Sequence, residues 1–256
     1  MKYIFSALTQ KGEAKSINQD GFALMTDESQ YGNVLFAVLC DGMGGLTEGE
    51  VASSYLVNKF STWFDNNSES LMNYGIDSGE LRLIWEKIIE TANQELLEYG
   101  KERNIQLGTT IVALLLDGHK FYAIHVGDSR LYVISNSMLK QITEDHSLVQ
   151  REVKLGHITK EEARYDPRRN VLLQGVGAIG RIMPNFYTGD INPNEVFIIC
   201  SDGFYHEIAE DELVSILNPA YLKHRENLES ELMGLIRTCK ERGEKDDISV
   251  IAIKTD

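Results

Sequence analysis

The chain has 256 residues and a formal net charge of −14, with 43% hydrophobic and 25% charged residues. These are ordinary globular proportions, so disordered, collagen-like and membrane-embedded chains are excluded. The acidic balance argues against nucleic-acid binding, which needs clustered lysine and arginine. There is no run of roughly 18 apolar residues and no signal peptide. We therefore expect one large soluble domain in the cytoplasm, with no membrane or nucleic-acid partner.

Four apolar runs typical of buried strands carry an aspartate at one end. Three of them lead into Asp41, Asp128 and Asp202, and the fourth follows the pair Asp246 and Asp247. A carboxylate at the end of a buried strand needs water, a hydrogen-bond donor or a cation. A single Asp-Gly pair is most often only a turn, but four such strand ends favour a shared function. Aspartates without a cysteine or histidine partner suit Mg²⁺ or Mn²⁺ rather than zinc.

Apolar periodicity predicts three strands and two long helices in the first part of the chain. Their expected ranges, in order, are 3–9, 21–26, 34–40, 47–66 and 80–103. Thr47 and Glu50 form a capping-box pattern at the start of the first helix. A polar loop is expected at 66–78, between the two helices.

The second part of the chain reads as a strand meander followed by an insertion and further elements. Strands are expected at 109–116, 119–127, 129–135, 138–143, 196–200 and 248–254, and helices at 210–217 and 226–242. The dipeptide Asp117-Gly118 between two β-rich runs is a strong hairpin signal, and Asn136-Ser137 marks a second turn. The polar segment from about 146 to 180, with a capping-box pair at Thr159 and Glu162, looks like an insertion on the sheet.

The order of these elements decides the fold class. Hairpins indicate antiparallel pairing, and helices that are grouped rather than alternating with strands indicate an α+β protein. We expect a four-layer α-β-β-α sandwich, with two central, mostly antiparallel sheets flanked by helix pairs. Residues 1–256 would form a single domain with the insertion at about 146–180.

Several other phosphate or nucleotide chemistries can be tested against residue spacing. The glycines at 175, 177 and 180 match G-x-G-x-x-G, but no helix pattern follows them, as a dinucleotide site would require. No arginine stands six positions after any of the three cysteines, so a cysteine phosphatase is excluded. A P-loop and the kinase signature set are also absent from the sequence.

Seven short motifs share the order and spacing of a known family. They are Asn18-Gln19-Asp20, Asp41-Gly42-Met43-Gly44-Gly45, Gly108-Thr109-Thr110, Val126-Gly127-Asp128-Ser129-Arg130, Thr143-Glu144-Asp145-His146-Ser147, Ser201-Asp202-Gly203 and Asp246-Asp247-Ile248-Ser249. Together they resemble the bacterial branch of the metal-dependent protein phosphatases of the 2C type. The resemblance spans nearly the whole chain and implies a β-sandwich with a binuclear Mn²⁺ or Mg²⁺ centre at one end.

The resemblance also implies roles for individual residues. By similarity, Asp41 bridges the two core ions and the Gly42 carbonyl binds one of them. Asp202 and Asp246 look like ligands of the first ion, and Asp20 like an acid near the second. Asp41 and Asp202 are therefore the expected catalytic residues.

A weaker third ion is implied as well, held by Asp128 together with Asp202. The insertion at about 146–180 resembles the family's flap, which borders the cleft. Lys15 stands where an arginine usually grips the phosphate, so it is the expected phosphate-binding residue. Two more departures concern charge: Gln19 stands where glutamate is frequent, and Asp247 where asparagine is usual.

The resemblance implies a serine/threonine phosphoprotein phosphatase that uses direct attack of a metal-activated water. Its partners would be phosphorylated proteins and, on the opposing side, a Ser/Thr kinase, and the chain would act as a monomer. Two alternatives stay open. One is a metal-dependent phosphatase of a small phosphate ester, which needs only the same metal cleft. The other is a non-catalytic binding relative, whose expected mark, the loss of Asp41, Asp202 or Asp246, is not found.

Overall fold

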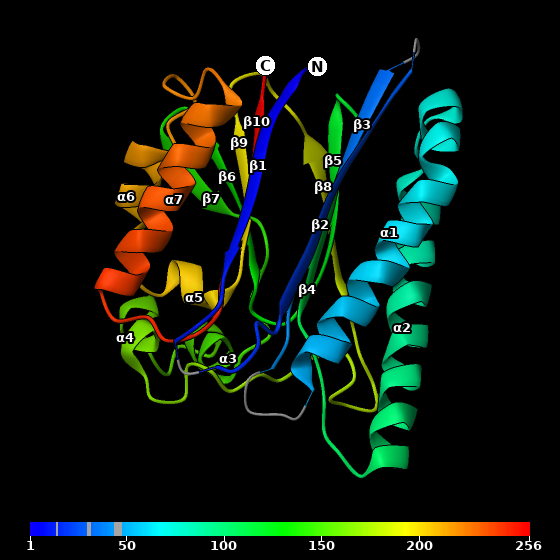
Figure 1. Cartoon of the computed structure of the whole chain (residues 1–256), viewed down its shortest axis with the longest axis vertical. Coiled ribbons are helices and arrows are strands. Elements are labelled where there is room, and N and C mark those ends of the chain that lie inside the picture. Colours follow the sequence, from blue (N-terminus) through cyan, green and yellow to red (C-terminus); the bar gives the residue numbers. More distant parts are fainter. Residues whose placement is uncertain (14, 30–31, 44–47) are drawn as a thin grey trace.

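The computed structural model describes residues 1–13, 15–29, 32–43 and 48–256. Within them, two five-stranded antiparallel sheets lie face to face (Figure 1). The first sheet has the order β1 (Tyr3–Gln10), β10 (Ile248–Thr255), β9 (Val196–Cys200), β6 (Arg130–Ser135) and β7 (Met138–Gln141). The second has the order β2 (Asp20–Ser29), β3 (Gly32–Asp41), β4 (Ile111–Leu116), β5 (Lys120–Val126) and β8 (Asn185–Asp190).

Helices cover the outer face of each sheet. Two long helices, α1 (Gly49–Tyr74) and α2 (Ser78–Arg103), lie against the second sheet, while α6 (Glu210–Ile216) and α7 (Arg225–Glu241) lie against the first (Figure 1). The shorter helices are α3 (Leu148–Lys154), α4 (Lys160–Tyr165) and α5 (Asp202–Tyr205). The predicted α+β fold, a four-layer α-β-β-α sandwich, is confirmed.

Two turns form as the sequence predicts. Gly118 has a φ of 89° in the β4–β5 hairpin. Asp117 Oδ1 accepts hydrogen bonds from His119 N and Lys120 N in the same turn. Asn136 and Ser137 both have positive φ, 51° and 60°, which is the backbone of a type I′ turn between β6 and β7. These turns fix the register of the meander.

Several stretches differ from the prediction, among them the short helix α5, which was not expected. Helix α1 was expected to end near Asn66 but continues to Tyr74, because its buried face extends to Ser68, whose hydroxyl donates to Asp27 Oδ2 at 2.6 Å. Strand β8 was not predicted, since it has no continuous apolar run. Its extended conformation is held by antiparallel pairing with β5. The capping-box residue Thr47 lies outside the described residues.

Three hydrophobic layers hold the sandwich together, because successive side chains of a strand point to opposite faces. Phe36 and Val38 of β3 pack with the helices α1 and α2, whereas Leu35 and Leu39 pack between the two sheets. A third layer joins the first sheet to α6 and α7. No helix in the described part of the chain is both long and apolar enough to span a bilayer.

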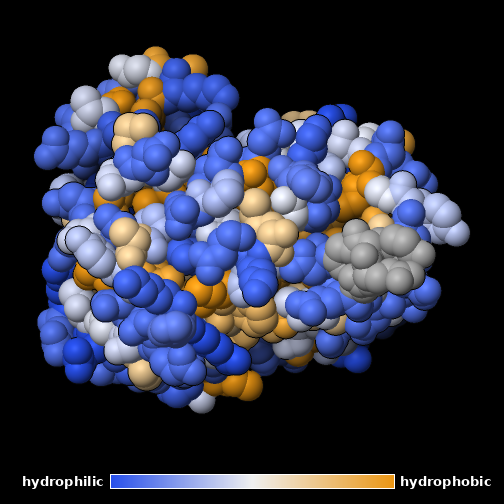
Figure 2. All heavy atoms as spheres, turned by 90° about the horizontal axis from the view of Figure 1, so that it is seen from above, coloured by the Kyte–Doolittle hydropathy of each residue, from blue (hydrophilic) through white to orange (hydrophobic). Residues whose placement is uncertain are grey.

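The face seen in Figure 2 is dominated by hydrophilic side chains. Seen from above, hydrophobic side chains are exposed only in small groups between them (Figure 2). Both termini lie at the top of the sandwich in Figure 1, and α3, α4 and α5 lie at its lower end. The lower end is also where β3 ends at Asp41 and where β9 leads into Asp202 at the start of α5.

Candidate active site

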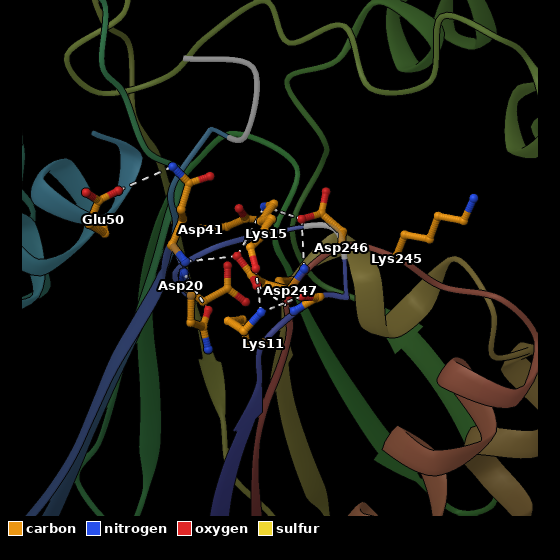
Figure 3. Close-up of polar contacts among 12 residues, drawn as sticks. Lys11, Lys15, Asp20, Asp41, Glu50, Lys245, Asp246 and Asp247 are labelled. Carbon is orange, nitrogen blue, oxygen red and sulfur yellow. Dashed lines mark hydrogen bonds and ion pairs between the residues drawn. The ribbon is translucent and has the colours of Figure 1, made fainter. Parts of the chain in front are cut away.

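The predicted aspartates come from both sheets and meet at this lower end. Asp20 begins β2 and is the direct cross-strand partner of Asp41, the last residue of β3. Asp202 follows β9 at the start of α5, and Asp246 stands two residues before β10. Figure 3 shows Asp20, Asp41 and Asp246 around one region. Asp128 lies in the turn between β5 and β6 and is buried.

The backbone of Asp41 is fixed by the loop that precedes β4. Thr110 Oγ1 accepts a hydrogen bond from Asp41 N at 3.0 Å, and Thr109 Oγ1 and Thr110 N donate to Asp41 O, each at 2.9 Å. Because the backbone groups are satisfied in this way, the carboxylate of Asp41 remains available for a ligand. The Gly108-Thr109-Thr110 motif thus has a positioning role that the sequence alone did not reveal.

Gly42 is required by close packing of three backbone segments. A Cβ atom at this position would lie 2.5 Å from Gly49 O and 2.6 Å from Gln19 O. Gly42 N donates to Gln19 O at 3.1 Å, and Ser53 Oγ donates to the same oxygen at 2.6 Å. The start of α1 is therefore held directly against the loop before Asp20.

The carboxylates raise one another's pKa values. Burial, followed by the charges of the neighbouring aspartates, raises the pKa of Asp41 and of Asp202 well above the usual range. The pKa of Asp20 is raised to about 6, mainly by burial and then by the charge of Asp247. The pKa of Asp128 is raised to about 7 by burial and by the charge of Asp145. This repulsion is what a bound cation would relieve.

Unpartnered oxygen atoms support the same fit. Both carboxylate oxygens of Asp20 and Oδ1 of Asp202 are buried and have no hydrogen-bond partner among the described residues. Hard divalent cations prefer oxygen ligands of this kind. Within residues 1–13, 15–29, 32–43 and 48–256, no group of three or more His, Cys, Asp or Glu side chains is already arranged to hold an ion. The fit to a metal therefore rests on the uncompensated charge and the free oxygens.

Lys15 lies on two of the acidic residues. Its Nζ atom forms ion pairs with Asp246 Oδ1 and, at 3.1 Å, with Asp247 Oδ2. Burial opposes the charged form, but the hydrogen bonds and charges of these two carboxylates raise the pKa of Lys15. Lys15 thus lies beside the acidic cluster, with its ammonium group turned to Asp246 and Asp247 (Figure 3).

Asp247 differs from the other aspartates in having its oxygens already occupied. Oδ1 accepts a hydrogen bond from Gly12 N at 2.8 Å, and Oδ2 accepts one from Gln19 N at 2.9 Å. Only 1% of the Asp247 side chain is exposed. It therefore ties the loop before β2 to the start of β10.

Sequence reasoning gave no role to Arg130, which organises the far side of the site. Its guanidinium group binds Asp145 through three hydrogen bonds of 2.7 to 3.1 Å and lies 3.6 Å from the centre of the Tyr205 ring. The Tyr205 hydroxyl in turn donates to Asp128 O at 3.2 Å. This cluster positions Asp128. The only sequence signal for the cluster is that Arg130 and Asp145 each lie in one of the seven family motifs.

A cavity of about 570 Å³ adjoins Asp128 and is bordered by β6, β7, α3, α4 and α5. Its lining includes the cations Lys160, Arg164 and Arg169, together with His206. Nδ1 of His206 lies 3.9 Å from Asp202 Oδ2, so this histidine adjoins the acidic cluster. Burial and nearby arginines lower the pKa of His206 to about 3, which keeps the imidazole neutral.

The glycine-rich segment at 175–180 supports the site rather than a nucleotide. Val176 pairs with Thr109 through two backbone hydrogen bonds of 2.9 Å, and Gly177 N donates to Asn93 Oδ1 at 2.7 Å. No helix starts after the third glycine. The segment therefore braces the loop that fixes Asp41.

Comparisons with known proteins cover almost the full chain. The family model described as Protein phosphatase 2C matches residues 9–249. The serine/threonine phosphatase stp of Listeria monocytogenes (serotype 4b, strain F2365) is 29% identical over 250 residues, which is 97% of this chain and 94% of that protein.

Solved structures agree with this assignment. The serine/threonine phosphatase Stp1 of Staphylococcus aureus has a TM-score of 0.86 and 27% identity, covering 100% of this chain and 96% of that chain. The catalytic domain of the phosphatase PstP, solved with two manganese ions, has a TM-score of 0.77 and 23% identity and covers 99% of both chains. With the family match and the site geometry pointing the same way, the chain belongs to the protein phosphatase 2C family.

Proposed function

We propose that this protein removes phosphate from phosphoserine and phosphothreonine in other proteins, by direct attack of water at phosphorus with two Mn²⁺ or Mg²⁺ ions. The observation that carries the proposal is the meeting of Asp20 and Asp41 from one sheet with Asp202 and Asp246 from the other. Their charges are uncompensated and several of their oxygens are free. Such a set of oxygens would hold two divalent cations.

When bound, two such ions lower the pKa of a coordinated water and neutralise the charge that develops on the phosphoryl oxygens. The protein's part is to hold the ligands. We assign the bridging position to Asp41, whose backbone is fixed by Thr109 and Thr110, and a carbonyl ligand to Gly42. We assign Asp202 and Asp246 to the first ion and Asp20 to the second.

A weaker third ion is assigned to Asp128 and Asp202. The charge of Asp128 contributes to the raised pKa of Asp202, so the two carboxylates are close enough to repel each other. Arg130 and Tyr205 hold the backbone of Asp128 in place without occupying its carboxylate. Lys15 is the assigned phosphate-binding cation.

The cavity beside Asp128 favours a phosphoprotein over a small phosphate ester. Its volume of about 570 Å³ far exceeds the need of a phosphate group alone. Lys160, Arg164 and Arg169 line it, and none of the three forms an ion pair with a carboxylate in the described part of the chain. A polypeptide next to the phosphorylated residue would fill this space and contact these cations.

We further propose that the chain works in the cytoplasm as a monomer and opposes a Ser/Thr kinase. Residues 1–256 would act as a single catalytic domain, with the segment from about 146 to 180 as its flap. That segment carries α3 and α4 and borders the cavity, which supports a role in substrate choice.

Hydrolysis of a phosphothreonine peptide and of an aryl phosphate tests this proposal. Each substrate is assayed with Mn²⁺, Mg²⁺, Zn²⁺ or EDTA. We expect turnover only with Mn²⁺ or Mg²⁺, and a higher kcat/KM for the peptide. A higher kcat/KM for small esters would favour the alternative substrate class, and metal-independent turnover would contradict the proposed chemistry.

A further inference from the structure

We infer that Lys15 is a built-in counter-cation of the metal site, which a divalent ion must displace from Asp246 before Lys15 can take the substrate phosphate. Metal loading and phosphate binding would then be coupled through one side chain. The inference rests on the proposed function, because it concerns the metal and phosphate of the same site.

The contacts of Lys15 carry the first step. Its Nζ atom is ion-paired to Asp246 Oδ1 and lies 3.1 Å from Asp247 Oδ2 (Figure 3). Only 18% of its side chain is exposed, so the ammonium group has exchanged most of its water for these carboxylates. An ammonium group and a divalent ion repel each other, so they compete for the same oxygen of Asp246.

The second step of the argument concerns Asp247, which would keep the ammonium group of Lys15 close to the metal site. It is anchored by the backbone N–H groups of Gly12 and Gln19, which flank Lys15 on the same loop. Asp246 is more exposed, at 36% of its side chain, and its carboxylate can turn to an incoming ion. Displaced from Asp246, the ammonium group would stay beside Asp247, next to the site rather than in bulk water.

The third step is the order of events that follows. Without metal, Lys15 neutralises part of the acidic cluster and is not available to an anion. Once an ion takes over Asp246, one of the two partners of Lys15 is lost and its charge can pair with a phosphate oxygen. Phosphate would therefore bind weakly to the metal-free protein and more tightly to the loaded one.

Calorimetric titration with Mn²⁺ tests the competition directly. Lys15→Met keeps the length of the stem but removes the competing cation, and we expect it to tighten the Kd for Mn²⁺ at the Asp246 site about tenfold. Lys245→Met is the matched control. Lys245 is adjacent to Asp246 in sequence, yet it is exposed and points away from the carboxylates (Figure 3). We expect the control to change the Kd less than threefold.

An unchanged Kd in Lys15→Met, or equal tightening in both variants, would overturn the inference. Circular dichroism in EDTA verifies that each variant is folded. Wild-type protein that binds Mn²⁺ and hydrolyses phosphopeptide while Lys15→Met binds Mn²⁺ no more tightly would refute only this inference. Wild-type protein that neither binds Mn²⁺ nor hydrolyses the peptide would refute the proposed function.

Titration with inorganic phosphate gives the second readout. Wild-type protein should bind phosphate at least tenfold more tightly with saturating Mn²⁺ than in EDTA. Part of any such gain comes from the metal itself, so the comparison is repeated on Lys15→Met and Lys15→Arg. We expect the gain to shrink in Lys15→Met and to be kept in Lys15→Arg; an equal gain in all three proteins would contradict release of Lys15.

Discussion

Asp202 stands two residues after the end of β9, and one of its carboxylate oxygens is buried without a partner among the described residues. We predict that Asp202→Asn lowers Mn²⁺-dependent turnover by more than about 100-fold, because loss of a ligand should exceed the effect of changing an outer-shell group. The folded protein should survive, since the change removes a repelling charge at nearly constant volume. Turnover at saturating Mn²⁺ and the unfolding midpoint in EDTA are measured together.

Asp117→Asn is the control for this variant. Asp117 also belongs to an Asp-Gly pair after a strand, but it forms an ordinary turn between β4 and β5. Its replacement should leave turnover unchanged. Near-normal turnover of Asp202→Asn in saturating Mn²⁺ would show that Asp202 is a turn residue as well.

His125 makes a second residue-scale prediction, about pH. The side chain is completely buried beside His146, with ring centres 4.8 Å apart, and neither ring nitrogen has a hydrogen-bond partner among the described residues. Burial, then the charge of His146, lowers the pKa of His125 well below 6.5. The unfolded chain therefore takes up a proton below about pH 6.5 that the folded chain does not, and stability falls as the pH falls.

The expected loss for this group is about 1.4 kcal/mol per pH unit below its unfolded pKa, or about 2 kcal/mol at pH 5. Urea unfolding in EDTA at pH 7 and pH 5 measures it. His125→Leu cannot take up the proton, so its stability should decline by about 2 kcal/mol less than that of the wild type. Parallel declines in both proteins would mean that other groups set the pH dependence.

Trp85 of α2 dominates the packing of the helix pair on the second sheet. Its ring lies 5.2 Å from that of Trp63 and 5.9 Å from that of Phe60, and it is fully buried. Trp85→Ala should cost about 3 to 5 kcal/mol of unfolding free energy. Trp85→Phe should cost less, because it also removes an indole N–H that has no partner among the described residues. Equal losses in urea unfolding would contradict a penalty from that N–H group.

Elements with a strong local signal were predictable from sequence. The strands that lead to Asp41 and Asp202 are continuous apolar runs, and the turn at Asp117-Gly118 has its own backbone chemistry. Strand β8 is different, because it is held in place by hydrogen bonds to β5, which is far away in sequence. The end of α1 was missed for a similar reason, since the hydrogen bond from Ser68 to Asp27 is a tertiary contact.

The same distinction applies to the site. An acid at the end of a buried strand is a local pattern, so the acidic set could be named from the sequence. The pairing of Lys15 with Asp247 joins residues more than 200 positions apart and needs the fold. The stacking of Arg130 on Tyr205 likewise has no local pattern that would reveal it.

At the scale of the whole molecule, a net charge of −14 and a cluster of repelling aspartates make stability depend on cations. Mn²⁺ would bind the folded chain and not the unfolded one. A free Mn²⁺ concentration of 100 times the Kd should therefore add about 2.7 kcal/mol to the unfolding free energy. Thermal unfolding with Mn²⁺ and with EDTA measures the shift. Asp202→Asn should respond much less, and an equal rise in both proteins would indicate binding elsewhere.

The two ends of the chain lie side by side at the top of the sandwich, away from the aspartates (Figure 1). Lys2 N donates to Asp256 O at 3.1 Å, and Asp256 N donates to Lys2 O at 2.9 Å. A tag, a fused domain or a surface linker at either end would therefore extend from the same side of the molecule and leave the opposite face open to large substrates. Attachments at both ends would instead crowd each other.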